Sequence, residues 1–283
     1  VTSLSLMQLL QRPQGQIVQG EIRLNLGNGK AYDVAKTPGT VMQHLRGNYI
    51  SMIFQEPMTS LNPVLKVGRQ VRETLLVHNP TMSKAEAKQR VVEMFQRVGI
   101  PEAEKRYDCY PLELSGGLRQ RVMIAMAMVC KPKLLIADEP TTALDVTIEA
   151  QILRLMKELR DETGMSVLII THNMGVVAEI CDYVYVMYAG KIMEQAETFE
   201  LFDHTMHPYT KGLLDSIPRI GQNAERLHTI PGVVPNLLHL SQGCPFSNRC
   251  EYATDQCRTE KAQLHPVAPD HQVRCFRCEE EHQ

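Results

Sequence analysis

Two short segments of this 283-residue sequence carry residue types suited to phosphate chemistry. Residues 114–121 read LSGGLRQR, so a serine and two glycines open a predicted helix. The first turn of a helix offers backbone N–H groups and a positive dipole end to an anion. Residues 134–137 are an apolar run typical of a buried strand, and Asp138 and Glu139 follow it directly. Two such carboxylates can hold Mg²⁺ and polarise a water molecule, so the two segments together predict nucleotide hydrolysis.

Alternating strands and helices between residues 134 and 195 position these groups. Asp145 is a predicted N-cap, and Gly164 ends the helix that it opens. Residues 167–170 and 183–188 are further apolar runs that predict strands. The apolar positions of the intervening helix share one face: Ile148, Ile152, Leu155 and Leu159. Near-continuous apolar strands separated by helices favour a parallel sheet covered on both faces, so we expect an α/β fold.

The rest of the chain is predicted to add strands, a helical insertion and an accessory segment. Residues 17–26 and 49–54 resemble strands, and residues 66–130 are mostly helical. A helix from about 117 to 129 is predicted to present one apolar face: Leu118, Val122, Ala125, Met126 and Val129. After Ile217 the pattern gives way to loops that contain Pro, Gly and His, which indicates an accessory C-terminal segment.

The overall composition excludes several classes of protein. The net charge is −2, which does not favour binding to nucleic acid or to anionic lipid. The chain is 43% hydrophobic, enough for a sizeable core. The longest apolar run, residues 122–130, is too short to span a bilayer, which takes about 20 residues. We therefore expect any membrane association to occur through a protein partner.

Several motifs in a fixed order resemble the ATPase subunit of an ABC transporter. The resemblance covers about residues 1–215 and follows the sequence LSGG-x-RQR, LLIADEP, Ala143-Leu144-Asp145 and Thr171-His172. It implies a P-loop NTPase-type parallel sheet with a helical subdomain at about residues 64–132. It also implies that ATP and Mg²⁺ are the cofactors.

The resemblance implies a role for each matching residue near the metal. Asp138 matches the aspartate that holds Mg²⁺ through water, and Glu139 matches the glutamate that polarises the attacking water. Gln55 follows the strand at 49–54 and resembles the glutamine that meets both the metal and that water. His172 matches the histidine that contacts the γ-phosphate. The aspartate that usually follows this histidine is Asn173 here.

Other matching residues are implied to act across a dimer. The signature residues would contact ATP held by the opposite subunit: Ser115, Gly116, Gly117 and Gln120. Asp145 matches the aspartate that couples the two sites. The resemblance therefore implies a homo- or heterodimer that encloses ATP between its subunits. Leu118 replaces a more common glutamine, and a bulky apolar residue there is similar to the peptide-importer branch.

The glycine-rich lysine loop of such ATPases is not found among these 283 residues. No G-x-x-x-x-G-K-[ST] string occurs, and residues 26–31, the nearest approach, are better interpreted as a turn between strands. In this family a run like the one at Val1 follows directly after that loop. We therefore expect the chain to begin inside a domain, just past the loop, and to bind and hydrolyse ATP poorly by itself.

The C-terminal segment carries a group of cysteines. Five lie in the last forty residues, and because no export signal is evident, metal ligation is favoured over disulfides. Four have x5, x6 and x17 spacing, which suits a [4Fe–4S] cluster or zinc: Cys244, Cys250, Cys257 and Cys275. Free thiols without metal remain an alternative, and Cys278 is either a spare thiol or an alternative ligand. Arg249, Arg258, Arg274 and Arg277 are expected to offset thiolate charge.

The segments HPYT at 207–210 and IPG at 230–232 resemble the extension of oligopeptide, dipeptide and nickel importer ATPases. We therefore expect an ABC ATPase domain at residues 1–215 and an importer-type extension at 216–283. The implied function is energy coupling in peptide import, on the cytoplasmic face of the membrane. The implied partners are a second ATPase subunit, two permease subunits and, indirectly, an extracytoplasmic binding protein.

Three alternatives remain. The cargo could be nickel, or the chain could be a non-hydrolytic partner that lends its signature to an intact subunit. A soluble ABC ATPase of DNA repair or translation is the third, and the cysteine-rich tail argues against it.

Overall fold

The structure, a computed structural model, describes residues 1–11, 13, 15–27, 29–55, 60–142, 144–217 and 229–280. The chain divides into two compact units, Val1–His172 and Asn173–Gln283. None of the helices in the described ranges combines the length and the apolar character needed to cross a membrane.

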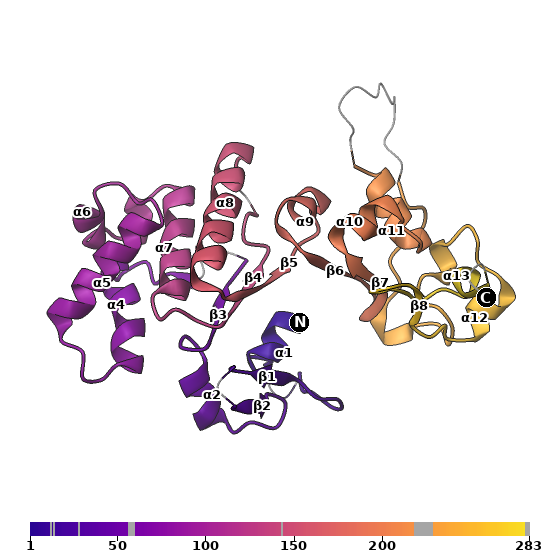
Figure 1. Ribbon diagram of the computed structural model, residues 1–283, viewed down its shortest axis with the longest axis horizontal. Helices are drawn as coiled ribbons and strands as arrows, with labels where there is room; N and C mark the ends of the chain where they lie inside the picture. The colour runs from indigo at the N-terminus through magenta and orange to yellow at the C-terminus, as the bar shows by residue number, and fades with distance from the viewer. Residues whose placement is uncertain are drawn as a thin grey trace. The chain divides into compact units, whose positions relative to one another are not determined.

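A three-stranded parallel sheet forms the centre of the first unit (Figure 1). Its strands, in spatial order, are β3 (Ile50–Ile53), β4 (Leu134–Asp138) and β5 (Ser166–Ile170). The register pairs Ile53 with Ala137 and Asp138 with Ile170, so all three strands end at the same edge of the sheet. The predicted α/β class with a parallel sheet is confirmed for this unit.

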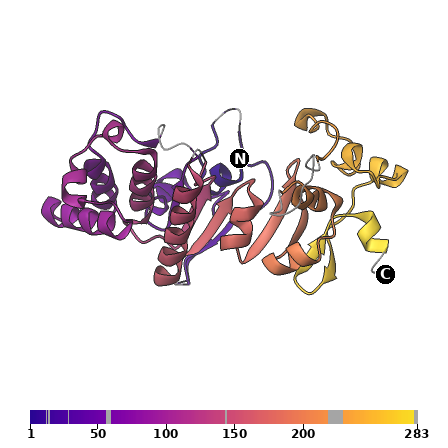
Figure 2. The ribbon, with the colours of Figure 1, turned by 90° about the horizontal axis from the view of Figure 1, so that it is seen from above.

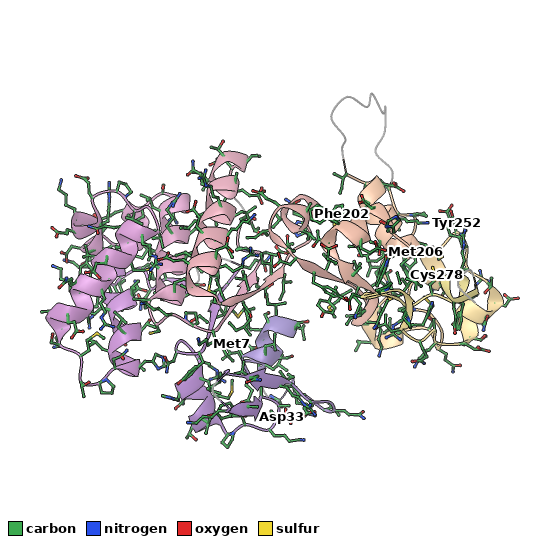
Figure 3. The ribbon with its side chains drawn as sticks, viewed as in Figure 1. Met7, Asp33, Phe202, Met206, Tyr252 and Cys278 are labelled. Carbon is green, nitrogen blue, oxygen red and sulfur yellow. The ribbon has the colours of Figure 1, made fainter. Side chains whose placement is uncertain are left out.

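The N-terminal part packs on a small hairpin. Helix α1 (Thr2–Leu6) precedes two antiparallel strands, β1 (Arg23–Asn25) and β2 (Ala31–Asp33), and helix α2 (Gly39–Leu45) follows them. The predicted strand at 17–26 is thus only three residues long. The turn predicted at 26–31 joins the two strands. Met7, labelled in Figure 3, lies in the apolar core of this part.

Helices connect β3 to β4 and β4 to β5. Figures 1 and 2 show the first group as a helical bundle. It consists of α4 (Val67–His78), α5 (Lys84–Arg97), α6 (Ala103–Tyr107), the 3₁₀ turn η1 (Pro111–Glu113) and α7 (Gly116–Met128). Helix α8 (Val146–Thr163) lies between β4 and β5 in the chain and is capped as predicted by Asp145 and by Gly164 in the left-handed conformation. The single apolar face predicted for α7 is wrong, because the helix also buries Gln120, Met123, Ile124 and Ala127, so its buried positions lie on more than one side.

The second unit contains an antiparallel sheet in the order β6-β7-β9-β8. Strand β6 (Tyr183–Tyr188) was expected to extend the parallel sheet, but it pairs with β7 (Lys191–Glu197) as a hairpin. The reason is the two-residue connection Ala189-Gly190, which can join only antiparallel strands. Helix α9 (Met174–Ile180) precedes this hairpin, and α10 (Thr198–Asp203) and α11 (Pro208–Asp215) follow it. Phe202, labelled in Figure 3, packs against the core of this hairpin.

The end of the chain returns to β7. Strand β9 (His271–Val273) pairs with β7 and with β8 (His265–Ala268). Short elements surround this pairing: the 3₁₀ turns η2 (Leu237–His239) and η3 (Ser247–Arg249), and helices α12 (Asp255–Thr259) and α13 (Phe276–Glu280).

A buried network of polar side chains fastens β9 to β7. The side chains of Glu194 and His271 are at most 1% exposed, and Oε1 of Glu194 lies 3.0 Å from Nε2 of His271. Nδ1 of His271 lies 3.2 Å from Oε1 of Glu200 on α10. Glu194 also accepts the backbone N–H groups of Met206, at 2.7 Å, and His207, at 3.1 Å. The network therefore joins both strands to the start of α11.

Candidate functional site

Asp138 and Glu139 lie at the carboxyl end of β4, where the apolar strand meets the sheet edge. The backbone N–H of Glu139 donates to the carbonyl of Ile170 on β5, at 2.8 Å. Glu139 adopts φ +47°, a left-handed conformation that residues with a Cβ rarely take. Such strain concentrates at functional sites, where the surrounding contacts hold the residue in place.

Three side chains hold the carboxylate of Glu139. Nε2 of Gln55 donates to Oε2 of Glu139 at 2.8 Å, and the hydroxyl of Thr142 donates to the same oxygen at 3.0 Å. Nδ1 of His172 lies 3.1 Å from Oε1. The structure thus brings together Gln55, Glu139 and His172, which were predicted from distant parts of the sequence. Thr142 was missed, although a hydroxyl three residues after a carboxylate in a turn is a recognisable signal.

Opposing effects act on the ionisation of Glu139. Burial raises the pKa of its carboxyl group, but the hydrogen bonds from His172, Thr142 and Gln55 and the charge of His172 together outweigh burial. The pKa of Glu139 is therefore lowered, and the carboxylate is ready to accept a hydrogen bond from water. His172 is 80% exposed at its side chain, so this end of the cluster is open to a ligand.

Asp138 is held from the N-terminal helix. The hydroxyl of Ser3, a fully buried residue on α1, donates to Oδ2 of Asp138 at 2.5 Å. This contact was not predicted, because 135 residues separate the two in sequence. The carboxylate of Asp138 and the amide oxygen of Gln55 are the hard oxygen donors that Mg²⁺ prefers, so the residues present fit this ion.

The signature residues open α7. Ser115 is its N-cap and accepts the backbone N–H of Leu118 at 3.4 Å. Ser115 and Gly116 are exposed. Gly117 faces α8, where a Cβ would lie 3.0 Å from the Ile148 side chain. The glycine therefore permits close packing of the two helices at the start of α7.

Gln120 and Asp145, also predicted to act across the dimer, have contacts within the chain. Gln120 is only 2% exposed, and its amide donates to the carbonyl of Pro140. It thus links the signature helix to the turn that follows Glu139. Asp145 is exposed and caps α8 by accepting the backbone N–H of Ile148 at 2.9 Å. Ala143 of the same predicted motif lies outside the described residues.

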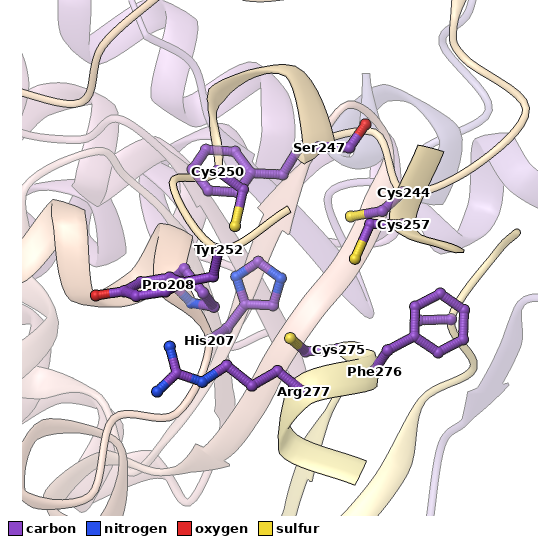
Figure 4. A pocket seen from close by; sticks show the side chains of 12 residues that line it. His207, Pro208, Cys244, Ser247, Cys250, Tyr252, Cys257, Cys275, Phe276 and Arg277 are labelled. Carbon is purple, nitrogen blue, oxygen red and sulfur yellow. The ribbon is translucent and has the colours of Figure 1, made fainter. Parts of the chain in front are cut away.

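The four predicted cysteines line one pocket of the second unit. In Figure 4 the side chains of Cys244, Cys250, Cys257 and Cys275 surround it. In the part of the chain that the structure describes, no group of three or more His, Cys, Asp or Glu residues is arranged to hold a metal ion. The thiols therefore share a pocket without forming a ready-made site for a single ion.

The electrostatics of these thiols differ. Burial raises the pKa of Cys244 and Cys250. Backbone N–H groups oppose this effect, and the charges of other cysteines in the pocket add to it. A hydrogen bond from Cys278 lowers the pKa of Cys275 to about 6, with help from backbone N–H groups and the charge of Arg277. Cys278 is buried. Cys275 is thus ionised more easily than Cys244 and Cys250.

The arginines expected to balance thiolate charge mostly have other partners. Arg249 donates to the carbonyls of Pro231 and Ile230, and Arg274 donates to those of Ile192 and Ala262. Arg258 pairs with Asp255, on its own helix α12. Arg277 lines the pocket, and its guanidinium lies 4.2 Å from the centre of the Tyr252 ring, over its face. Only Arg277 therefore fits the predicted role.

Comparisons with known proteins agree with these features. The ABC transporter family matches residues 2–142, and the family described as the oligopeptide/dipeptide transporter C-terminal region matches residues 193–257. The oligopeptide transport ATP-binding protein AppD of Bacillus subtilis is 50% identical over 281 residues, 99% of this chain and 84% of that protein. The oligopeptide transport ATP-binding protein OppD of Haemophilus influenzae is 54% identical over 226 residues, 80% of this chain and 70% of that protein.

Solved structures support the same assignment. A dimeric ATP-binding cassette in a post-hydrolysis state with ADP and Pi has a TM-score of 0.57 and 25% identity, covering 65% of this chain and 76% of that one. CbiO1 of Clostridium perfringens, part of an ABC transporter complex, has a TM-score of 0.53 and 30% identity, covering 63% and 69%. The chain belongs to the family of ABC transporter ATP-binding subunits, in its oligopeptide/dipeptide branch.

Proposed function

We propose that this chain is the ATP-hydrolysing subunit of an ABC importer for di- or oligopeptides. The observation that carries the proposal is the carboxylate of Glu139, held by Gln55, Thr142 and His172 at the sheet edge beside Asp138. A lowered pKa keeps this carboxylate ionised at neutral pH, as a group that orients water must be. The names of relatives such as AppD support peptides as the cargo.

Each residue has a distinct part in the proposed reaction. Glu139 accepts a hydrogen bond from the attacking water and polarises it towards the γ-phosphate. Gln55 and His172 fix the orientation of Glu139, and the exposed ring of His172 contacts the γ-phosphate. Asp138 and the amide oxygen of Gln55 would hold Mg²⁺, which neutralises phosphate charge when bound. Ser3 fixes one oxygen of Asp138 in position.

The signature completes the site of a second subunit. Ser115 and Gly116 are exposed at the start of α7, and a 13-residue helix offers its first N–H groups to the phosphates of ATP. Gln120 links this segment to the turn after Glu139 through the carbonyl of Pro140. Asp145, at the start of α8, is proposed to couple the two sites of the dimer. The proposed assembly is a dimer of ATPase subunits, homo- or heteromeric. It docks on two permease subunits at the cytoplasmic face of the membrane and receives cargo from an external binding protein.

We also propose an iron–sulfur cluster in the cysteine pocket, at residues 244, 250, 257 and 275. Four thiols spread around one pocket suit a cluster, whose ligands bind different irons, better than a single zinc ion, whose ligands surround one point. The cluster would stabilise the fold of the proposed extension, residues 216–283. The proposed ABC domain is residues 1–215, with a helical subdomain at about 64–132.

ATP hydrolysis by two proteins tests the main proposal. One is the 283-residue chain, and the other carries ahead of Val1 the glycine-rich loop segment of a relative such as AppD. We expect Mg²⁺-dependent hydrolysis from the fused protein and much less from the chain alone. No hydrolysis by the folded fusion would refute the proposal, and equal hydrolysis by both would refute the requirement for the added loop.

The cargo needs a separate test, since a nickel importer is the main alternative. The fused protein is reconstituted with a peptide permease pair in vesicles that contain ATP. Uptake of a labelled oligopeptide supports the proposal, whereas uptake of nickel alone refutes the peptide assignment.

A further inference from the structure

His207 lines the same pocket as the four cysteines, although the sequence marked it only as part of the HPYT segment. The residue is 2% exposed and directly precedes α11. Its ring packs against Phe246, with ring centroids 5.9 Å apart. In Figure 4 the ring lies among the pocket side chains, between Cys250 and Cys275 in the view.

The hydrogen bonds of His207 determine where its ring proton lies. Nδ1 accepts the backbone N–H of Tyr209 at 3.0 Å and so caps α11. A ring nitrogen that accepts a hydrogen bond carries no proton, so the proton of the neutral ring is on Nε2. The backbone N–H of His207 is fixed by Glu194, which prevents the residue from turning away. His207 therefore presents an N–H donor from a rigid position.

This tautomer distinguishes a donor from a metal ligand. Ligation through Nε2 would require the ring proton to move to Nδ1. Nδ1 would then be a donor that faces the backbone N–H of Tyr209, and it could no longer accept that hydrogen bond. That change would leave the backbone N–H of Tyr209 without its acceptor, which is unfavourable for a partly buried group. The geometry consequently favours donation by His207 over ligation.

We infer that His207 donates a hydrogen bond from Nε2 to a sulfur atom of the cluster proposed for the cysteine pocket, and thereby raises its reduction potential. The inference rests on the proposed iron–sulfur cluster. Reduction adds negative charge to the cluster sulfurs, and a donor favours the more negative state. His207 is then a tuning residue, while the cysteines remain the ligands.

Two substitutions separate this role from the capping role. In His207→Asn, Oδ1 can replace Nδ1 as the cap of α11, since Asn is a favoured N-cap, but no atom replaces Nε2. In His207→Gln, the longer side chain can bring an amide N–H close to the position of Nε2. The full chain and both variants are purified anaerobically, analysed for iron and sulfide, and titrated by redox potentiometry with EPR detection.

We expect all three proteins to hold equal iron and sulfide. His207→Asn should lower the equilibrium constant for reduction about tenfold, which is about 59 mV for one electron. His207→Gln should restore part of this shift. Equal potentials in the wild type and the Asn variant would overturn the inference, and so would loss of iron from the Asn variant alone, because that result identifies a ligand.

Two controls keep the outcomes distinct. A wild-type protein without iron and sulfide would refute the proposed cluster itself, and the inference with it. Long-range ¹H–¹⁵N NMR of the cluster-free wild type reads the tautomer of His207 without any substitution. A proton on Nε2 supports the inference, and a proton on Nδ1 overturns it even if the variants fail to fold.

Discussion

Replacing Glu139 by glycine and by alanine separates the backbone strain at this residue from the contacts of its side chain. Both variants lose the hydrogen bonds to Gln55, Thr142 and His172, so these losses cancel when the two are compared. At φ +47°, a residue with a Cβ pays roughly 1–2 kcal/mol that glycine does not. In the opposite direction, glycine lowers the free energy of unfolding by about 0.4–1 kcal/mol relative to alanine, because it gives the unfolded chain more conformational entropy.

The difference predicts that Glu139→Gly is more stable than Glu139→Ala by about 0.5–1 kcal/mol. Urea unfolding of the 283-residue chain measures it, and hydrogen exchange at the amides of β4 assigns the transition to the first unit. Lys157, exposed in the middle of α8, is the matched control, because there alanine should be the more stable by about 1 kcal/mol. Equal or greater stability of Glu139→Ala would refute the argument from strain.

Further predictions concern packing and charge. Gly68→Ala would place a Cβ 2.2 Å from the Tyr107 ring and should destabilise the first unit by about 1–3 kcal/mol in urea. Tyr107→Ala removes the ring, so additive effects of the two substitutions would contradict this clash. His271→Ala leaves the Glu194 carboxylate buried without its imidazole and should cost about 3–5 kcal/mol in thermal unfolding; an equal loss in a Glu194→Gln background would contradict the pairing. His172→Ala should raise the pKa of Glu139, so that its carboxyl group protonates at a higher pH. An unchanged ¹³C NMR titration of Glu139 would contradict the assigned cause.

Local patterns in the sequence were sufficient to predict which residues lie at the sheet edge of the first unit. Apolar runs ending in polar residues predicted that Asp138 and His172 follow neighbouring parallel strands, and the register of β4 and β5 agrees. Gln55 could be placed beside them only through the family resemblance. Its hydrogen bond to Glu139 depends on a separation of 84 residues, which no local pattern encodes.

Contacts between distant segments explain what the sequence did not predict. The pairing of β6 with β7 followed from a turn, but the return of β9 to β7 depends on the buried pair of Glu194 and His271. The sequence did not single out Ser3, and it marked His207 only as part of the HPYT segment, because only folding brings these residues to Asp138 and to the cysteine pocket. A helix with buried residues on several sides, like α7, likewise has no single apolar face to detect.

The catalytic role of Glu139 is the central claim, and the rate of ATP hydrolysis by Glu139→Gln tests it most directly. The substitution is made in the protein with the glycine-rich loop segment ahead of Val1. Glutamine preserves the size of the side chain but removes the charge that polarises water, so we predict a fall in kcat of at least about 100-fold with ATP binding retained. A variant that hydrolyses ATP at the wild-type rate would contradict the account.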